Sequence, residues 1–192
     1  MSKAKILLIG GGGHCHSVID VVEQQGIYEI YGIVDVLEKV GSRVLDYKVI
    51  GYDDDLIDLF QHCPNAVITM GHIKSNTLRV KLFETVKQIG YELPTIISPL
   101  AYVSRHAQIS PGTVVMHQAL VNANAKIGDN CIINTKALIE HDVSIGNHCH
   151  IATAAVINGG VVVRDNTFVG SNSVVVQEAQ VINFVKAGSI YK

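Results

Sequence analysis

A strict six-residue period of apolar positions runs through the second half of the chain. Every sixth residue is Ile or Val at Val103, Ile109, Val115, Val121, Ile127, Ile133, Ile139, Ile145, Ile151, Ile157, Val163, Val169, Val175 and Val181. The residue two positions before each of these is mostly small, as at Ala119 and Ala125. A hexapeptide repeat with β-branched residues pointing inward predicts a parallel β-helix. Three hexapeptides, or 18 residues, would close one triangular coil.

The first hundred residues follow another pattern, in which short apolar runs alternate with helical spacing. Short apolar runs predict buried strands at 5–9 and 66–70, and we expect further strands at 28–36 and 92–97. Apolar residues at helical spacing predict helices at 17–25, 53–60 and 76–89. Alternating strands and helices indicate a small α/β domain with a Rossmann-like parallel sheet. We therefore expect this domain at 1–98 and the β-helix with a C-terminal tail at 99–192, joined at Ser98-Pro99.

Composition narrows the class of protein. The 192 residues are 48% apolar and 17% charged, which excludes a disordered chain. The formal charge of −2 argues against a general nucleic-acid binder. No apolar run approaches the length of a membrane span or a signal peptide, so we expect a cytoplasmic protein. Four scattered cysteines form no CxxC pair and support neither a zinc ribbon nor a redox motif.

A glycine-rich loop, Gly10–Gly13, lies between the first predicted strand and the first predicted helix. Backbone N–H groups and the helix dipole can hold a phosphate at such a place. The full dinucleotide fingerprint fails because its third glycine is replaced by Cys15 or His16, according to the register. Asp35 follows about 20 residues later, where a carboxylate can accept hydrogen bonds from a nucleotide. The loop predicts a nucleotide-sugar site; the alternative is a structural turn with a solvated Asp35.

Two motifs together resemble one family. The segment GGGGHCHSV (residues 10–18) on a Rossmann-like domain precedes a β-helix that carries IEHD (residues 139–142). This arrangement resembles the sialic acid O-acyltransferase family of left-handed β-helix acetyltransferases. It is similar within that family to the bacillosamine-pathway N-acetyltransferases acting on UDP-4-amino sugars and to perosamine N-acetyltransferases. The resemblance implies acetyl-CoA as cosubstrate, a left-handed β-helix, and a homotrimer with active sites between neighbouring β-helices.

The resemblance also implies roles in the β-helix. His141 matches the general base, because a neutral imidazole can take a proton from a sugar amine near neutral pH. Asp142, or alternatively Glu140, would orient its ring. His150 matches a histidine near the acetyl-CoA thioester, and Gly159 lies one coil above His141, where a side chain could block the pantetheine arm. The alternatives are an ordinary turn histidine at 141 and a polar rim residue at 150.

In the first domain the resemblance assigns the sugar nucleotide to His14, with backbone contacts from Gly12 and Gly13, and the nucleotide base to Asp35. Gly71, which ends a predicted strand, could line the same pocket. The chain departs from the family at residues 187–192, which lack the proline of a stretch that borders CoA. His141, His148 and His150 do not have the spacing of a zinc site, so we expect no metal.

The motifs and the resemblance together predict an acetyl-CoA-dependent N-acetyltransferase for a nucleotide-linked 4-amino sugar, of the UDP-4-amino-4,6-dideoxy sugar or GDP-perosamine type, used in surface glycan synthesis. Two alternatives remain open at this point. The same histidine could deprotonate a hydroxyl in O-acetylation of a sialic-acid-like sugar. The chain could also be a non-catalytic scaffold that binds sugar nucleotides, although a scaffold has no need of a histidine beside an acid.

Overall fold

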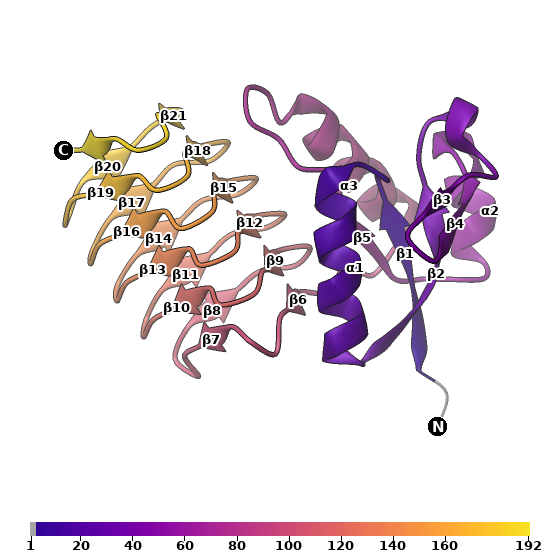
Figure 1. Ribbon diagram of the computed structural model, residues 1–192, viewed down its shortest axis with the longest axis horizontal. Coiled ribbons are helices and arrows are strands. Elements are labelled where there is room, and N and C mark those ends of the chain that lie inside the picture. The colour runs from indigo at the N-terminus through magenta and orange to yellow at the C-terminus, as the bar shows by residue number, and fades with distance from the viewer. Residues whose placement is uncertain (1–2) are drawn as a thin grey trace. The chain divides into compact units, whose positions relative to one another are not determined.

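The computed structural model describes residues 3–192 (Figure 1). The chain folds into two compact units, Met1–Pro94 and Thr95–Lys192. Within residues 3–192, no helix combines the length and the apolar character that crossing a membrane requires.

The first unit is a five-stranded sheet with helices. The strand order is β3-β4-β2-β1-β5, for β1 (Ala4–Ile9), β2 (Tyr28–Val34), β3 (Arg43–Val44), β4 (Tyr47–Gly51) and β5 (Ala66–Ile68). All neighbours are parallel except β3 and β4. The helical elements are α1 (Gly13–Gln25), η1 (Leu37–Lys39), η2 (Asp53–Asp55), α2 (Leu56–Phe60) and α3 (Thr77–Ile89). The pair β3 and β4 was not predicted, because its few buried residues do not form an apolar run.

The inner strand β1 is buried on both faces: successive side chains point to opposite sides, and all four side chains from Ile6 to Ile9 are buried. Leu7 and Ile9 belong to a cluster with Leu82 and Phe83 of α3. Helix α1 buries its own apolar stripe, lies outside that cluster and packs on the other face (Figure 1). It ends at Gly26, whose left-handed φ of 69° favours glycine.

The second unit is a parallel β-helix built from three sheets of two-residue strands. The β13 sheet contains β7 (Tyr102–Val103), β10 (Leu120–Val121), β13 (Leu138–Ile139), β16 (Val156–Ile157), β19 (Val174–Val175) and β22 (Ile190–Tyr191). The β14 sheet contains β8 (Gln108–Ile109), β11 (Lys126–Ile127), β14 (Ser144–Ile145), β17 (Val162–Val163) and β20 (Gln180–Val181). The β15 sheet contains β6 (Ile96–Ile97), β9 (Val114–Val115), β12 (Ile132–Ile133), β15 (His150–Ile151), β18 (Phe168–Val169) and β21 (Phe184–Val185).

The register of the β-helix follows the predicted 18-residue coil. Ile133 pairs with Ile151, and Ile139 pairs with Ile157. The predicted Ile and Val positions from Val115 to Val181 are at most 3% exposed and form one continuous core. Val103 and Ile109 pack against this core but are only partly buried, because they belong to its first coil. The prediction that this series faces the interior is confirmed.

The expected strand at 92–97 is divided between the units. Glu92 bridges to Asn65 in the first unit, whereas Ile96–Ile97 pairs with Val114–Val115 in the β-helix. The division therefore falls at Pro94 and Thr95 rather than at Ser98-Pro99. The boundary lies there because Ile96–Ile97 forms its backbone hydrogen bonds with a strand of the β-helix, and a strand belongs to the sheet with which it pairs.

The last coil departs from the hexapeptide period. Residues 182–183 alone connect β20 to β21, where the earlier coils use a four-residue turn such as 164–167. Asn183 takes a left-handed φ of 68° in this shortened turn. Val185 therefore enters the core, and the β-helix continues through β22 beyond the last predicted position.

Candidate active site

His141 lies in the turn between β13 and β14, at one edge of the β-helix. Its Nδ1 is 2.8 Å from Oδ2 of Asp142. A carboxylate can only accept, so the hydrogen-bonded ring nitrogen Nδ1 carries the proton and Nε2 keeps its lone pair in the neutral ring. The side chain of His141 is 57% exposed. The ring is thus oriented by an acid and open to a reactant.

Asp142 is itself held from one coil below. Asn124 Nδ2 donates to its Oδ1 at 2.6 Å. Asp142 has a left-handed φ of 61°, a conformation that short polar residues tolerate better than most. Hydrogen bonds from Asn124 and His141 lower the pKa of Asp142. The carboxylate therefore remains ionised and fixed in place at neutral pH.

The electrostatics of the corner favour a protonated His141. The hydrogen bond to Asp142, followed by the charges of Asp142 and Glu140, raises the pKa of His141 above its ordinary value. Glu140 contributes charge but not orientation: its Oε2 accepts the backbone N–H of His141 at 3.2 Å and the Asn122 amide at 2.9 Å. Of the two acids considered for the orienting role, Asp142 is the one that bonds the ring.

Gly159 lies one coil above His141, and the two coils are joined by a hydrogen bond from Gly160 N–H to the His141 carbonyl at 3.1 Å. A Cβ added to Gly159 would lie 2.7 Å from Cε1 and 2.8 Å from Nε2 of His141. The imidazole therefore lies over the glycine. The N–H of Gly159 donates to no acceptor within residues 3–192.

His150 lies on the outward side of β15, because its neighbour Ile151 points into the core. Its Nε2 is 3.1 Å from the Asn134 amide nitrogen, which can only donate, so Nε2 accepts. Its ring also meets Phe168 edge-on, with centroids 5.2 Å apart. In the neutral ring of His150, the hydrogen bond from Asn134 to Nε2 therefore places the proton on Nδ1.

His141 and His150 lie on opposite sides of the β-helix. Three sheets form a triangular prism, and the corner between the β13 and β14 sheets faces away from the β15 sheet. His141 lies at that corner and His150 on that sheet. The structure therefore does not bring these two predicted residues together within one β-helix.

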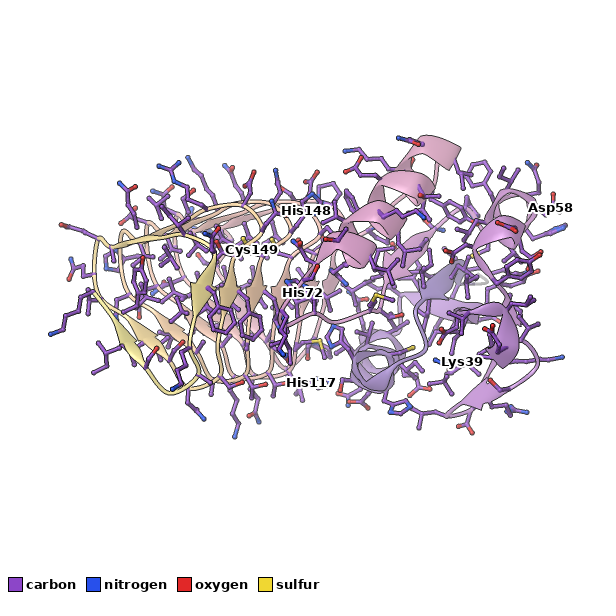
Figure 2. All side chains as sticks on the ribbon, turned by 90° about the horizontal axis from the view of Figure 1, so that it is seen from above. Lys39, Asp58, His72, His117, His148 and Cys149 are labelled. Atoms are coloured by element: carbon purple, nitrogen blue, oxygen red, sulfur yellow. The ribbon has the colours of Figure 1, made fainter. Side chains whose placement is uncertain are left out.

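His148 occupies a third place, at the corner between the β14 and β15 sheets, where its Nδ1 is 3.1 Å from the Asn130 amide (Figure 2). Within residues 3–192, no three His, Cys, Asp or Glu side chains are grouped to hold a metal ion.

In the first unit the glycine loop is fixed on two sides. Thr69 Oγ1 donates to the Gly10 carbonyl at 2.6 Å, and Gly11 N–H donates to Asp35 Oδ2 at 2.9 Å. Helix α1 follows with Gly12 as N-cap and no side-chain cap. Within residues 3–192, and apart from the chain neighbours and the backbone of the helix itself, no atom lies within 4 Å of a Cβ placed on Gly12 or Gly13. The first turn of α1 thus has room for an anion beside its N–H groups.

Asp35 accepts more hydrogen bonds from the protein itself than the sequence predicted. Its Oδ2 also accepts from Lys39 Nζ at 2.8 Å, and its Oδ1 accepts from Val36 N–H at 2.8 Å (Figure 2). Burial acts to raise the pKa of Asp35, but the hydrogen bonds from Lys39, Val36 and Gly11 outweigh it, and the pKa is lowered. Asp35 therefore shapes the glycine loop from the end of β2.

Gly71 lies against the first turn of α1: a Cβ there would be 3.4 Å from His14 Cβ. The end of β5, just before Gly71, is held by Arg79, which is 1% exposed and donates through Nη1 to the carbonyls of Ile68 and Met70, both at 2.7 Å. The two predicted residues His14 and Gly71 are thus neighbours.

Sequence reasoning missed several supporting residues. Asn124 and Asn122 lie 18 residues before Asp142 and Glu140, so the coil length could have revealed both. Arg79 and Asn134 carry no such signal, because their contacts do not follow the 18-residue spacing.

Comparison with known proteins agrees with this architecture. Residues 5–86 match the PglD N-terminal domain family, and residues 124–159 match the bacterial transferase hexapeptide family. A search of curated proteins found no match.

Among solved structures, the acetyltransferase domain of PglB from Neisseria gonorrhoeae is 27% identical, with a TM-score of 0.89, and the match covers 99% of this chain and 92% of that one. The same domain in complex with acetyl coenzyme A gives a TM-score of 0.88 at 27% identity, covering 100% and 94%. PerB from Caulobacter crescentus, in complex with CoA and GDP-perosamine, is 27% identical with a TM-score of 0.70, covering 98% and 94%.

The fold class is the predicted one, an N-terminal α/β domain followed by a left-handed β-helix of hexapeptide repeats. The chain is an acetyltransferase of the hexapeptide-repeat type. It combines that repeat with a PglD N-terminal domain.

Proposed function

We propose that this chain transfers an acetyl group from acetyl-CoA to the amino group of a nucleotide-linked 4-amino sugar. The observation that carries the proposal is the chain of hydrogen bonds from Asn124 through Asp142 to His141, which orients a ring whose side chain is 57% exposed. The PglB domain in complex with acetyl coenzyme A and PerB in complex with GDP-perosamine support both substrates.

The chemistry is a direct transfer. The neutral sugar amine attacks the thioester carbonyl carbon while His141 Nε2 takes the proton that the nitrogen loses. Asp142 stabilises the resulting imidazolium, and we assign the oxyanion to the Gly159 N–H as donor. The C–S bond then breaks, and the imidazolium protonates the leaving thiolate. The products are the N-acetyl sugar and CoA, with His141 neutral again.

The sugar nucleotide is assigned to the first unit. The open first turn of α1 at Gly12 and Gly13 suits the diphosphate. His14 and Gly71, which are neighbours, would line the same pocket, and Asp35 holds the loop. The resemblance of GGGGHCHSV and IEHD to the sialic acid O-acyltransferase family supports this division of labour between the units.

A homotrimer completes the site in this proposal. His150 is assigned to the acetyl-CoA thioester, yet it lies on the side of the β-helix opposite to His141. If both residues act on one acetyl-CoA, they come from two copies of the chain. A heterologous contact of this kind closes into a ring about a threefold axis.

The outer face of the β13 sheet suits such a contact. Its outward side chains are all apolar or aromatic, namely Tyr102, Leu120, Leu138, Val156, Val174 and Ile190. Tyr102 is 60% and Ile190 is 67% exposed. The β14 sheet instead presents mainly polar residues outward: Gln108, Lys126, Ser144, Val162 and Gln180. A continuous apolar stripe on a surface marks an interaction face.

An assay of CoA release tests the proposal. The chain is incubated with acetyl-CoA and, separately, a UDP-4-amino sugar, GDP-perosamine and free sialic acid. Release with a nucleotide 4-amino sugar is the expected result, with mass spectrometry locating the acetyl group on nitrogen. Release only with sialic acid would establish O-acetylation instead. Sugar-nucleotide binding without release from any acceptor would leave a scaffold.

A further inference from the structure

Gly159 stands at a corner position that elsewhere carries a side chain. The equivalent residues of the other coils, at 18-residue intervals, are Arg105, Ala123, His141 and Gln177. Gly159 is also absent from the glycines with a positive φ, so its backbone does not require glycine. Neither the coil geometry nor the backbone therefore explains the missing side chain.

The His141 ring explains it. The three atoms nearest to a Cβ on Gly159 all belong to that ring: Cε1 at 2.7 Å, Nε2 at 2.8 Å and Nδ1 at 3.3 Å. Real Cβ atoms do not approach other atoms within 3.0 Å, so the ring would have to move. Moving it changes the alignment of Nδ1 with Asp142 Oδ2, which are now 2.8 Å apart.

We propose that Gly159 is a positioning residue for the general base, because its lack of a side chain allows the imidazole of His141 to lie over it while bonded to Asp142. This inference rests on the proposed function, in which His141 is the base. It differs from the expectation that Gly159 leaves space for the pantetheine arm, and the two roles predict different losses.

Gly159→Ala tests the inference, since alanine keeps the backbone N–H and adds only the Cβ. The His141 ring is the exposed end of a rotatable side chain, so its displacement should leave the melting temperature unchanged. We expect kcat to fall by about tenfold to a hundredfold, as for a catalytic group misplaced by about 1 Å. The KM for acetyl-CoA should stay within about twofold of the wild-type value. A fall in kcat without a rise in KM is expected when a catalytic group is misplaced and the binding of acetyl-CoA is unchanged.

Two further measurements separate ring positioning from space for CoA. In a His141→Ala background, Gly159→Ala should cause no additional loss of rate, because the ring it displaces is gone. Calorimetry should give the same acetyl-CoA affinity with and without Gly159→Ala. Gln177→Ala, at the same corner one coil further on, is the matched control and should keep wild-type kcat.

An equal fall in acetyl-CoA affinity from Gly159→Ala in both backgrounds would overturn the inference and assign Gly159 to the pantetheine arm. An unchanged kcat in Gly159→Ala would also overturn it. Failure of the proposed function is distinguishable, because the wild-type protein would then release no CoA with a nucleotide 4-amino sugar, whereas failure of this inference leaves that release intact.

Discussion

Asn124 Nδ2 lies 2.6 Å from Asp142 Oδ1, and the two residues are separated by one complete coil of the β-helix. The other oxygen of the same carboxylate holds His141 Nδ1 at 2.8 Å. The stacking of coils therefore lets Asn124 hold Asp142, and Asp142 in turn orients the ring of His141. The candidate base is fixed by residues of two successive coils.

Replacing His141 by Ala should lower kcat by about 10²–10⁴-fold, the usual contribution of a general base. The affinity for the sugar nucleotide, measured by calorimetry, should be largely retained, because Gly12, Gly13 and His14 belong to the other unit. More than about a tenth of wild-type kcat in a correctly folded protein would place the base elsewhere. Glu140 and His150 would then be the next variants to measure.

Replacing Asp142 by Asn should move the pH–rate profile. Asp142 raises the pKa of His141, so the wild-type rate should rise with pH through a limb above 6.5, the ordinary histidine value. The amide removes the charge, lowers the pKa of His141 and shifts that limb to lower pH, with a smaller loss of kcat than His141→Ala. Asn124→Ala should shift it in the same direction by less. A limb at an unchanged pH in Asp142→Asn would contradict this account.

Replacing His150 by Ala should weaken acetyl-CoA binding more than sugar-nucleotide binding. The loss should be severalfold or more, since His150 is buried among Asn134 and Phe168 and its removal disturbs that face. Calorimetric titration with each ligand gives the two affinities. Equal losses for both ligands would count against the assignment of His150 to the thioester.

Mixing the two impaired variants His141→Ala and His150→Ala should raise activity above that of either one if His141 and His150 act together across an interface. A trimer assembled from His141→Ala and His150→Ala subunits contains an interface at which both wild-type histidines meet. Co-refolding the variants and assaying the isolated mixed trimers checks this. Mixed trimers no more active than the parent variants would show that the two histidines do not act together across an interface, and an active monomer in light scattering would exclude the trimer.

Replacing Asp35 by Asn should weaken sugar-nucleotide binding severalfold and leave acetyl-CoA binding unchanged. The amide loses the ion pair with Lys39 and offers Gly11 a weaker acceptor. Because the pKa of Asp35 is lowered, the wild-type affinity should not depend on its titration near neutral pH. Asp58→Asn on α2 of the same unit provides the control (Figure 2). Equal effects of both variants would remove Asp35 from the site.

The sequence alone determined the β-helix and the place in it of the repeating positions from Val103 to Val181. A six-residue period repeats each position after 18 residues, so it predicts which side chains enter the core and which stack at a corner. His141 at an edge and Asn124 beneath Asp142 follow from that arithmetic. The glycine loop before α1 was also readable, since a strand, glycines and a helix occur in direct succession.

Only the tertiary structure decided which neighbours touch. Rotamers, not spacing, turn Asp142 rather than Glu140 toward the imidazole and lay that ring over Gly159. In the first unit, contacts such as Thr69 with Gly10 join residues 59 positions apart, and no repeat governs such a distance. The pairing of Ile96–Ile97 with β9 likewise depended on which sheet edge could satisfy its backbone, which local apolar pattern does not reveal.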